Sequence, residues 1–390
     1  MSGIDETHLL LDLGLQPVSN RYLQSLKQSE EHFVLKLGQN YSNGQIQLID
    51  PFPQHELKPR YDWITYNEPE AHLDHLVDAL HRTIPDKKKA VVGGVSFKDD
   101  STLERFSSLG YQTWRIDVEK DLSLEGHMGV ESVQGSLNRL TAQTIKDKYG
   151  EAECLIVRHI WEHVYNQSEF ASAISLLLSD EGRVVFEVPD CTRLLKSGDS
   201  TMIWEEHLYY YTPSTIVHSL EANGFEVLDT EIVPYLGENS IIVIARNRTK
   251  RGVYVDSDDL IEQIDLGRRY VEGFRQSKIK IHDYLLSQNC TRGVAIFGAG
   301  HSACGFTSFM ELEKHISVFV DDDKNKKDLY MPKSKRPIVS SNQFRADEYS
   351  LVLMAVNPQV EDIVMEKIKQ KTNGQAKTGS IFPFSKNYLF

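Results

Sequence analysis

Several features that would place this chain in a specialised class are missing from its sequence. Its four cysteines, Cys154, Cys191, Cys290 and Cys304, are far apart and form no C-x-x-C pair. Neither a disulfide framework nor a structural zinc site is therefore expected. No apolar run approaches the roughly 20 residues of a membrane span, and the first residues lack the basic and apolar regions of a signal peptide. We expect a cytoplasmic protein without a membrane partner.

Basic charge is also scarce. The formal net charge of −13 argues against non-specific nucleic-acid binding, which needs basic surface, although a local basic patch stays open. What is present is a globular composition, with 40% hydrophobic and 25% charged residues. A chain of 390 residues is too long for one ordinary core, so two or three domains are expected.

The apolar pattern divides the chain into four parts. Residues 1–75 contain short β-like runs broken by turn residues and predict a small N-terminal lobe. Residues 76–248 alternate apolar strands with helices, which is typical of a doubly wound, mostly parallel α/β sheet, and end in two runs that predict an antiparallel hairpin at its edge. Residues 249–290 predict a linking helix. Residues 291–390 restart the βα pattern and predict a smaller, Rossmann-like α/β domain.

The expected ligand site of the central sheet lies beyond the carboxyl ends of its strands. Three loops are placed there: residues 93–102, the turn after Asp117, and residues 158–164. Asp117 either accepts hydrogen bonds from a ribose diol or caps the next helix. The first loop lacks the G-x-G-x-x-G spacing, which S-adenosylmethionine, a cofactor without phosphates, tolerates better than NAD.

A second Gly-rich turn, FGAGHSACGF, follows a strand of the C-terminal domain. Its glycines Gly298, Gly300 and Gly305 miss the dinucleotide spacing, so a tight turn is favoured over an NAD site. His159 and His163 stand four residues apart and suggest a metal pair if they share a helix face. No third ligand follows at a sensible spacing, so no metal is expected.

The segment IWEEHLYYYTP places Glu205, Glu206 and His207 directly before three tyrosines. An unpaired buried charge is costly, so this cluster indicates a site rather than a core strand. A neutral histidine near pH 7 is a suitable general base, and a carboxylate partner fixes its tautomer. Packing is the favoured interpretation of Tyr209–Tyr211, with one ring left open as part of a pocket wall.

The order of several segments resembles one family. The segments are DLGLQPVSNRYL, RHIWEHV, EVPD, IWEEHLYYYTPSTIVHSLEANGFEV, ENSIIVIAR and the C-terminal VDDD block with its following Lys and Pro. Together they resemble the three-domain, S-adenosylmethionine-dependent sugar C-methyltransferases. The resemblance implies a class I, Rossmann-like methyltransferase domain and a substrate that is a nucleotide-linked 4-keto-6-deoxyhexose, typically methylated at C3. It also implies a place in polysaccharide or secondary-metabolite biosynthesis.

The resemblance assigns roles to individual residues. It makes His207 the base that removes the proton next to the ketone, and Glu206 the group that orients its imidazole. The enolate formed then attacks the methyl sulfonium. The residues expected at the cofactor are Ser96, Lys98, Asp99, Asp117, Gln134 and His159, and those expected at the substrate are Trp204, His163, Tyr210 and Asn239.

Three features depart from the family pattern. The N-terminal lobe lacks the two C-x-x-C pairs that hold zinc, so it is expected to be metal-free. VSFKDDSTL replaces the glycine-rich loop, and only Asp99 keeps its acid for the cofactor's ammonium group. Trp204 stands where the family has a tyrosine, and an indole supplies no hydroxyl proton. An O- or N-methyltransferase and a non-catalytic sugar-nucleotide-binding subunit therefore stay open as alternatives.

Overall fold

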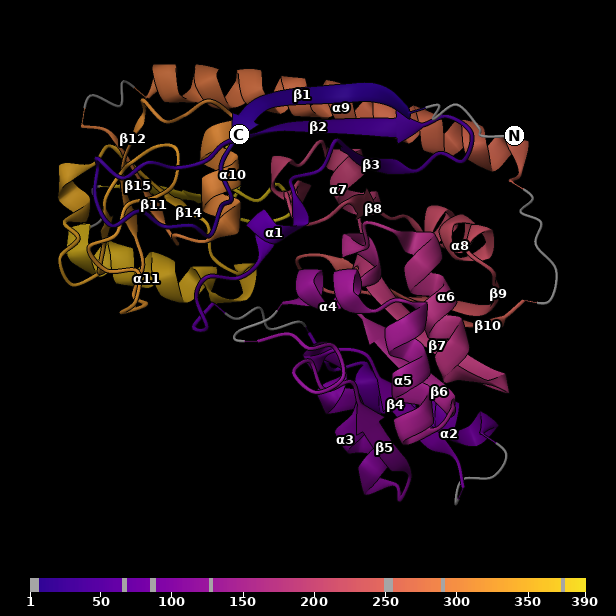
Figure 1. Cartoon of the computed structure of the whole chain (residues 1–390). Helices are drawn as coiled ribbons and strands as arrows, with labels where there is room; N and C mark the ends of the chain where they lie inside the picture. Colours follow the sequence, from indigo (N-terminus) through magenta and orange to yellow (C-terminus); the bar gives the residue numbers. More distant parts are fainter. Residues whose placement is uncertain are drawn as a thin grey trace.

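The computed structural model describes residues 7–64, 69–84, 89–125, 129–248, 255–288, 292–372 and 376–390. Cys290 lies outside them, whereas Cys154, Cys191 and Cys304 are buried free thiols. The described chain forms three sheets (Figure 1), one near the N-terminus, one in the centre and one near the C-terminus. No described helix is both long and apolar enough to cross a lipid bilayer.

The N-terminal sheet is antiparallel. Its strands β1 (Thr7–Gln16), β2 (Phe33–Asn40) and β3 (Ile46–Ile49) follow one another along the chain and are succeeded by the short helix α1 (Gln54–Leu57). A fourth strand, β8 (Tyr209–Tyr210), comes from the central part of the chain and pairs with β3. The short β-like runs expected in this part of the chain are therefore confirmed as strands.

The central sheet has the order β5-β4-β6-β7-β10-β9. Its strands are β4 (Val91–Gly94), β5 (Gln112–Arg115), β6 (Ala152–Arg158), β7 (Leu178–Asp190), β9 (Phe225–Val233) and β10 (Asn239–Asn247). The strands β5, β4, β6 and β7 are parallel, and β10 runs antiparallel to both β7 and β9. The expected doubly wound sheet and its edge hairpin are confirmed.

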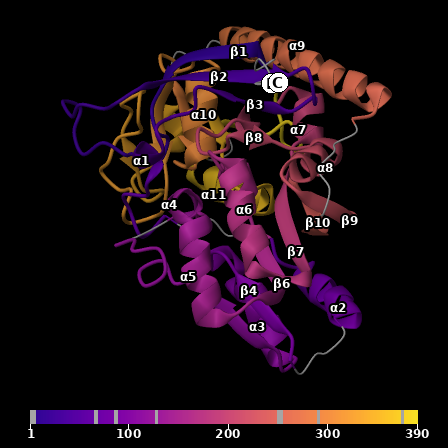
Figure 2. The ribbon, with the colours of Figure 1, turned by 45° about the vertical axis from the view of Figure 1, so that its right-hand side comes forward.

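Helices cover both faces of this sheet, because its inner strands are apolar on both sides. Along β6, Cys154 and Ile156 pack with α2 (Leu73–Thr83) and α3 (Asp100–Ser108). The alternate residues Leu155 and Val157 pack on the other face, with α5 (Arg139–Tyr149), α6 (Gln167–Leu177) and α8 (Pro213–Ala222). The shorter helices α4 (Val130–Ser136) and α7 (Thr192–Ser197) lie toward the other two sheets (Figure 2).

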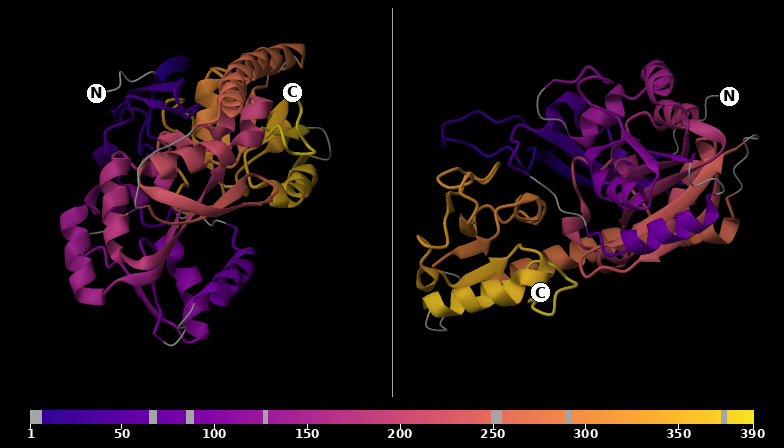
Figure 3. Two further views of the ribbon diagram at one scale, coloured as in Figure 1. Left: turned by 90° about the vertical axis from the view of Figure 1, so that its right-hand side faces the viewer. Right: turned by 90° about the horizontal axis from the view of Figure 1, so that it is seen from below.

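The C-terminal part begins with the long helix α9 (Ser257–Ser287), which runs beside β1 and β2 (Figures 1 and 3). A five-stranded parallel sheet of order β13-β12-β11-β14-β15 follows. Its strands are β11 (Val294–Phe297), β12 (Ile316–Val320), β13 (Ile338–Val339), β14 (Leu351–Met354) and β15 (Lys377–Ser380), and its helices are α10 (His301–Phe309) and α11 (Glu361–Thr372). The smaller α/β unit predicted for this region is present.

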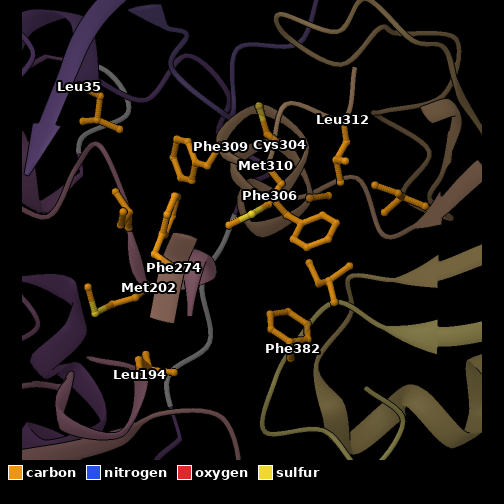
Figure 4. Packing of buried hydrophobic residues seen from close by; sticks show 14 of the residues in the cluster. Leu35, Leu194, Met202, Phe274, Cys304, Phe306, Phe309, Met310, Leu312 and Phe382 are labelled. Carbon is orange, nitrogen blue, oxygen red and sulfur yellow. The ribbon is translucent and has the colours of Figure 1, made fainter. Parts of the chain in front are cut away.

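One hydrophobic cluster connects the N-terminal sheet with the C-terminal one (Figure 4). Leu35 of β2, Leu194 of α7, Phe274 of α9 and Phe306 of α10 all belong to it, as does Phe382 after β15. Because each sheet buries apolar surface against the next part of the chain, the parts share a core. This shared packing brings residues from all of them to the border of one cavity.

A close helix contact inside this core gives a testable prediction. Gly198 ends α7 with φ +66°, and a Cβ there would lie 2.3 Å from the carbonyl carbon of Gly273 in α9. We expect Gly198→Ala to lower the free energy of unfolding by about 1–3 kcal/mol through this clash, in addition to the backbone cost. Gly110→Ala is the matched control, because Gly110 has φ +88° and open space around its Cβ position. Equal losses in the two variants, measured by denaturant unfolding, would contradict the clash.

Candidate active site

A cavity of about 1140 Å³ opens at the carboxyl ends of β4, β6 and β7. The loops after these strands form one wall, as the doubly wound fold predicts. Asn20 and Pro59 from the N-terminal part and Ser302 and Phe382 from the C-terminal part complete it. The cavity therefore lies between all three parts of the chain, and its volume leaves room for a cofactor together with a substrate.

The loop after β4 is closed by a capping box. The Ser96 hydroxyl accepts the backbone N–H of Lys98 at 3.2 Å, and the Asp99 carboxylate accepts that of Ser96 at 2.8 Å. The same carboxylate accepts N–H groups from Val95 at 2.7 Å and Arg158 at 2.9 Å. Ser96 and Asp99 are both fully buried and do not line the cavity. The expectation that Asp99 meets the cofactor's ammonium group is wrong here, because its oxygens fasten the loop to β6; Lys98, on the same loop, does line the cavity.

Burial makes Asp99 a source of pH-dependent stability. Desolvation raises the pKa of Asp99 to about 7, against the opposing effect of its backbone N–H bonds and Arg158. Because the folded chain then holds this proton more tightly than the unfolded chain, stability falls as the pH rises from about 4 to about 7. We expect the urea midpoint of unfolding to change less with pH over this range in Asp99→Asn than in the unaltered protein. An unchanged pH slope would show that Asp99 is ionised throughout it.

A buried ion pair lies at the ends of β6 and β7. The Arg158 Nε donates to Glu187 Oε2 at 2.5 Å, and both side chains are almost fully buried. The other carboxylate oxygen of Glu187 lies 3.2 Å from His72 Nε2 and 3.3 Å from His159 Nε2. Burial alone would raise the pKa of Glu187, but His159, His72 and Arg158 hold it well below its usual range. Glu187 is therefore an ionised acid shared by three basic groups.

His159 reaches the cavity from a special backbone position. Its φ is +49°, a left-handed conformation that is uncommon for a residue other than glycine. Its N–H donates to the Glu187 carbonyl at 2.8 Å, which holds the turn after β6 in place. Strained residues of this kind cluster at functional sites. The predicted cofactor residue His159 accordingly lines the cavity beside Arg158.

Two neighbouring glutamates face different parts of the molecule. Glu205 accepts hydrogen bonds from the Ser19 N–H at 2.6 Å and the Ser19 hydroxyl at 3.2 Å, and pairs with His301 Nε2 at 2.7 Å. Burial raises the pKa of Glu205, but His301 and Ser19 outweigh it and lower the pKa overall. Glu206 instead lines the cavity, where Asn20 donates to its carboxylate at 3.3 Å. Of the two adjacent carboxylates noted in the sequence, Glu205 therefore makes structural contacts and Glu206 faces the cavity.

Two histidines meet edge to face in the cavity wall. The rings of His163 and His207 have centroids 4.7 Å apart at 90°, and Trp204 stacks beside His207 at 5.3 Å. His163 Nδ1 hydrogen-bonds the Glu206 carbonyl at 2.9 Å. Because only an N–H can meet a carbonyl oxygen, this bond leaves a lone pair on Nε2 of the neutral ring. Burial, with a contribution from His207, lowers the pKa of His163 well below its usual range, so it is neutral at pH 7.

Four other predicted site residues, Asp117, Gln134, Tyr210 and Asn239, do not line the cavity. The Asp117 carboxylate accepts the N–H groups of Glu119 and Lys120 and pairs with the Lys120 ammonium at 2.9 Å, which lowers the pKa of Asp117 to about 2. Asp117 therefore closes the turn after β5 rather than capping a helix, because the next described helix, α4, begins only at Val130. Gln134 is buried and accepts the Tyr165 N–H at 3.2 Å.

Tyr210 and Asn239 are also held within the protein. The Tyr210 hydroxyl is buried against the backbone of Trp204, to whose carbonyl it donates at 3.0 Å. The Asn239 amide donates to Asp190 at 3.3 Å, and its oxygen accepts the Tyr235 N–H at 3.2 Å. The expected substrate contacts of Tyr210 and Asn239 are therefore not formed at this cavity, because both side chains fix local structure.

Arg158, Glu187 and Glu70 were not predicted as site residues, although Arg158 and Glu70 line the cavity. A signal for the first two exists in the sequence. Arg158 directly follows the apolar run of residues 154–157, and Glu187 interrupts the apolar run of residues 184–188. Charged residues are rarely fully buried unless paired. Opposite charges at equivalent ends of adjacent parallel strands predict such a pair.

One group of described residues could also hold a metal ion. Ligand atoms of Glu162, His163 and His207 all lie within 4.8 Å of one another. Of the pair that the sequence suggested, only His163 belongs to this group, and His159 does not. The other members of the group are the neighbouring Glu162 and His207, which comes from a loop that the fold brings back to the end of β6. The expectation that the chain uses no metal stays a prediction, which a chelator can test.

A comparison with known families decides the class of this chain. Residues 30–230, more than half of its length, match the model of a methyltransferase domain. The chain belongs to the methyltransferase family. Residues 253–383 of this methyltransferase match a second model, the C-methyltransferase C-terminal domain. The central sheet is thus a class I, Rossmann-like methyltransferase fold, in which S-adenosyl-L-methionine is the methyl donor.

Individual relatives are more distant. The methyltransferase is 25% identical to C-methyltransferase NovU of Streptomyces niveus over 175 residues, which are 45% of this chain and 41% of that relative. Burkholderia thailandensis 1,6-didemethyltoxoflavin-N1-methyltransferase, solved with S-adenosylhomocysteine, is 15% identical with a TM-score of 0.31, covering 46% of this chain and 79% of its own. Magnesium protoporphyrin IX methyltransferase of Synechocystis, also solved with S-adenosylhomocysteine, is 18% identical with a TM-score of 0.30, covering 46% and 83%.

The cavity of this methyltransferase fits a cationic donor. Six aspartates and glutamates line it, against three lysines and arginines. Such an excess of carboxylates favours a ligand that carries positive charge, as a sulfonium does. Lys98 and His159, both predicted at the cofactor, stand on the loops where the fold places it.

Proposed function

We propose that this methyltransferase transfers a methyl group from S-adenosyl-L-methionine to the carbon beside a ketone, in a small substrate such as a nucleotide-linked 4-keto-6-deoxyhexose. The observation that supports it most is the pairing of His163 and His207 on the cavity wall, next to Glu206. The C-methyltransferase C-terminal domain and the similarity to NovU support transfer to carbon.

His207 is the base in this proposal. Its imidazole is half-buried, lines the cavity, and is held between the Trp204 face and the His163 edge. Such packing keeps the plane of the His207 ring fixed. His207 takes the proton from the carbon next to the ketone, and the ketone acidifies that bond by accepting the electron pair as an enolate. Glu206 is the carboxylate that orients His207 and stabilises its charged form.

His163 has a separate part in the proposal. It is neutral, its Nδ1–H is bound by the Glu206 carbonyl, and burial keeps it uncharged. Its Nε2 accepts a hydrogen bond from a hydroxyl group of the substrate, which orients the sugar ring while His207 removes the reacting proton. When bound, S-adenosyl-L-methionine would supply an electrophilic methyl group to the enolate carbon, and S-adenosylhomocysteine would be the leaving group.

The proposal is tested by proton exchange before methyl transfer. The full-length protein is incubated in D₂O with the keto-sugar nucleotide and S-adenosylhomocysteine, and deuterium beside the ketone is followed by NMR. Exchange that His207→Gln abolishes is expected. A parallel incubation contains S-adenosyl-L-methionine instead of S-adenosylhomocysteine. A product methylated there on oxygen or nitrogen, together with no deuterium exchange, would replace the proposal by the O- or N-methyltransferase alternative. Sugar binding without any binding of S-adenosylhomocysteine would favour the non-catalytic subunit.

Metal removal gives a further prediction. The proposed steps need only side chains, so we expect turnover to survive exhaustive dialysis against EDTA. Calorimetric titration of Mn²⁺ or Zn²⁺ into the dialysed protein serves as the control. Activity lost with EDTA and restored by one of these ions would instead place an ion at Glu162, His163 and His207.

A further inference from the structure

Arg158 has a donor group that no described residue uses. A guanidinium carries five N–H bonds. Nε donates to Glu187 at 2.5 Å, and Nη1 lies near the Lys98 carbonyl at 2.6 Å and the Ser101 hydroxyl at 3.4 Å. Nη2 is buried and has no partner among the described residues. A buried donor without a partner costs free energy, so its presence in a cavity wall needs a reason.

The position of Glu187 explains why Nη2 is left over. An arginine usually binds a carboxylate through Nε and Nη2 together, with both acid oxygens engaged. Here the second oxygen of Glu187 faces His72 and His159 at 3.2 and 3.3 Å instead. Glu187 therefore binds the guanidinium through Nε, while the Lys98 carbonyl and the Ser101 hydroxyl accept from Nη1. Nη2 is the nitrogen left to donate to another anion.

A carboxylate stands next to this guanidinium on the cavity wall. Glu70 Oε1 lies 3.5 Å from Arg158 Nη1 and accepts the Ser101 hydroxyl at 2.6 Å, and its side chain is 41% exposed. A cation and an anion so close together match a ligand that carries both charges on one carbon. The amino-acid end of the methyl donor is such a group, since its carboxylate and ammonium share the α-carbon.

We propose that Arg158 binds the α-carboxylate of the cofactor's amino-acid end through Nη2, and that Glu70 binds its ammonium group. The inference rests on the proposed use of S-adenosyl-L-methionine. In this arrangement Arg158 and Glu70 bind the amino-acid end of the cofactor, which a glycine-rich loop would bind through its backbone N–H groups. It also accounts for a loop after β4 whose buried Asp99 and Ser96 face inward, since the loop then only has to support Arg158 through the Lys98 carbonyl.

The test compares ligands first, on the unaltered full-length protein. Calorimetry measures S-adenosylhomocysteine, its decarboxylated analogue and 5′-methylthioadenosine, which lacks the whole amino-acid end. Loss of a hydrogen-bonded charge predicts an affinity about 10- to 100-fold weaker for the decarboxylated analogue. Equal affinities for it and for S-adenosylhomocysteine would overturn the inference while leaving the proposed function intact. No binding of any of the three would overturn the proposed function, and the inference with it.

Variants then assign the effect to residues. Arg158→Lys keeps the charge but loses the planar fork, and should weaken S-adenosylhomocysteine about 10-fold while leaving 5′-methylthioadenosine unchanged. Glu70→Gln should weaken S-adenosylhomocysteine but not its deaminated analogue. Arg246→Lys, which changes an exposed Arg–Glu pair on the same sheet, is the matched control and should bind all ligands normally. A uniform loss across ligands in Arg158→Lys, with an intact thermal transition, would contradict direct recognition.

Discussion

His207→Gln should abolish methyl transfer while leaving the fold and the cofactor affinity unchanged. General-base catalysis contributes about 10²–10⁴-fold, and the glutamine amide cannot take up a proton. The substitution retains a planar group of similar size next to Trp204 and His163, so the packing of the cavity wall is expected to survive. The measurement is kcat for the keto-sugar nucleotide, with calorimetry of S-adenosylhomocysteine alongside.

His218→Gln is the matched control for this variant. His218 lies on α8, contacts Asp259 at 3.8 Å and does not line the cavity, so its substitution should leave kcat unaltered. A His207→Gln enzyme with the normal kcat would move the base elsewhere. A loss of S-adenosylhomocysteine affinity that parallels the loss of kcat would instead make His207 a residue of the binding wall.

The second large effect is expected from Glu187→Ala. This change removes the counter-charge of Arg158 inside the protein, where both side chains are nearly without solvent exposure. Breaking a buried pair by removing one partner costs about 3–5 kcal/mol, because the remaining charge stays desolvated. His72 and His159 also lose the oxygen that they face. Denaturant unfolding at pH 7 measures the difference in the free energy of unfolding.

A pair on the same sheet provides the comparison. Glu226 of β9 and Arg246 of β10 lie 3.1 Å apart, but each side chain is more than two-fifths exposed. Water screens this pair, so Glu226→Ala should cost no more than about 1 kcal/mol. If both alanine variants lost the same stability, burial would not be what makes the Arg158–Glu187 pair important.

Much of the fold could be predicted from local patterns. The alternation of apolar strands and helices predicted the order of elements in the central and C-terminal parts. This works because the pattern of each βα unit is contained in a short stretch of sequence. The strand-end rule correctly placed the loops after β4 and β6 at the cavity. Lys98, His159, His163, Trp204, Glu206 and His207 all line it, and their individual roles stay predictions.

The rest depended on contacts between distant residues. The sequence suggested that the Asp99 carboxylate is available to a cofactor. Its oxygens instead accept backbone N–H groups, one of which belongs to Arg158 of β6, 59 residues further along the chain. Glu205 stands in one sequence cluster with Glu206 and His207, but its partner is His301, 96 residues away. Neither contact has a local signature, because both arise only when separate parts of the chain pack together.

The borrowed strand β8 has a consequence for how the enzyme can be divided. Tyr209 and Tyr210 pair with Gln47 and Ile46 of β3, directly after the segment that carries His207. Cutting the chain near residue 75 would therefore leave β3 with unpaired backbone groups along its edge, a common cause of aggregation. It would also release the strand that anchors the proposed base. A hybrid made with a related methyltransferase would have to exchange residues 7–49 and residues 204–210 together.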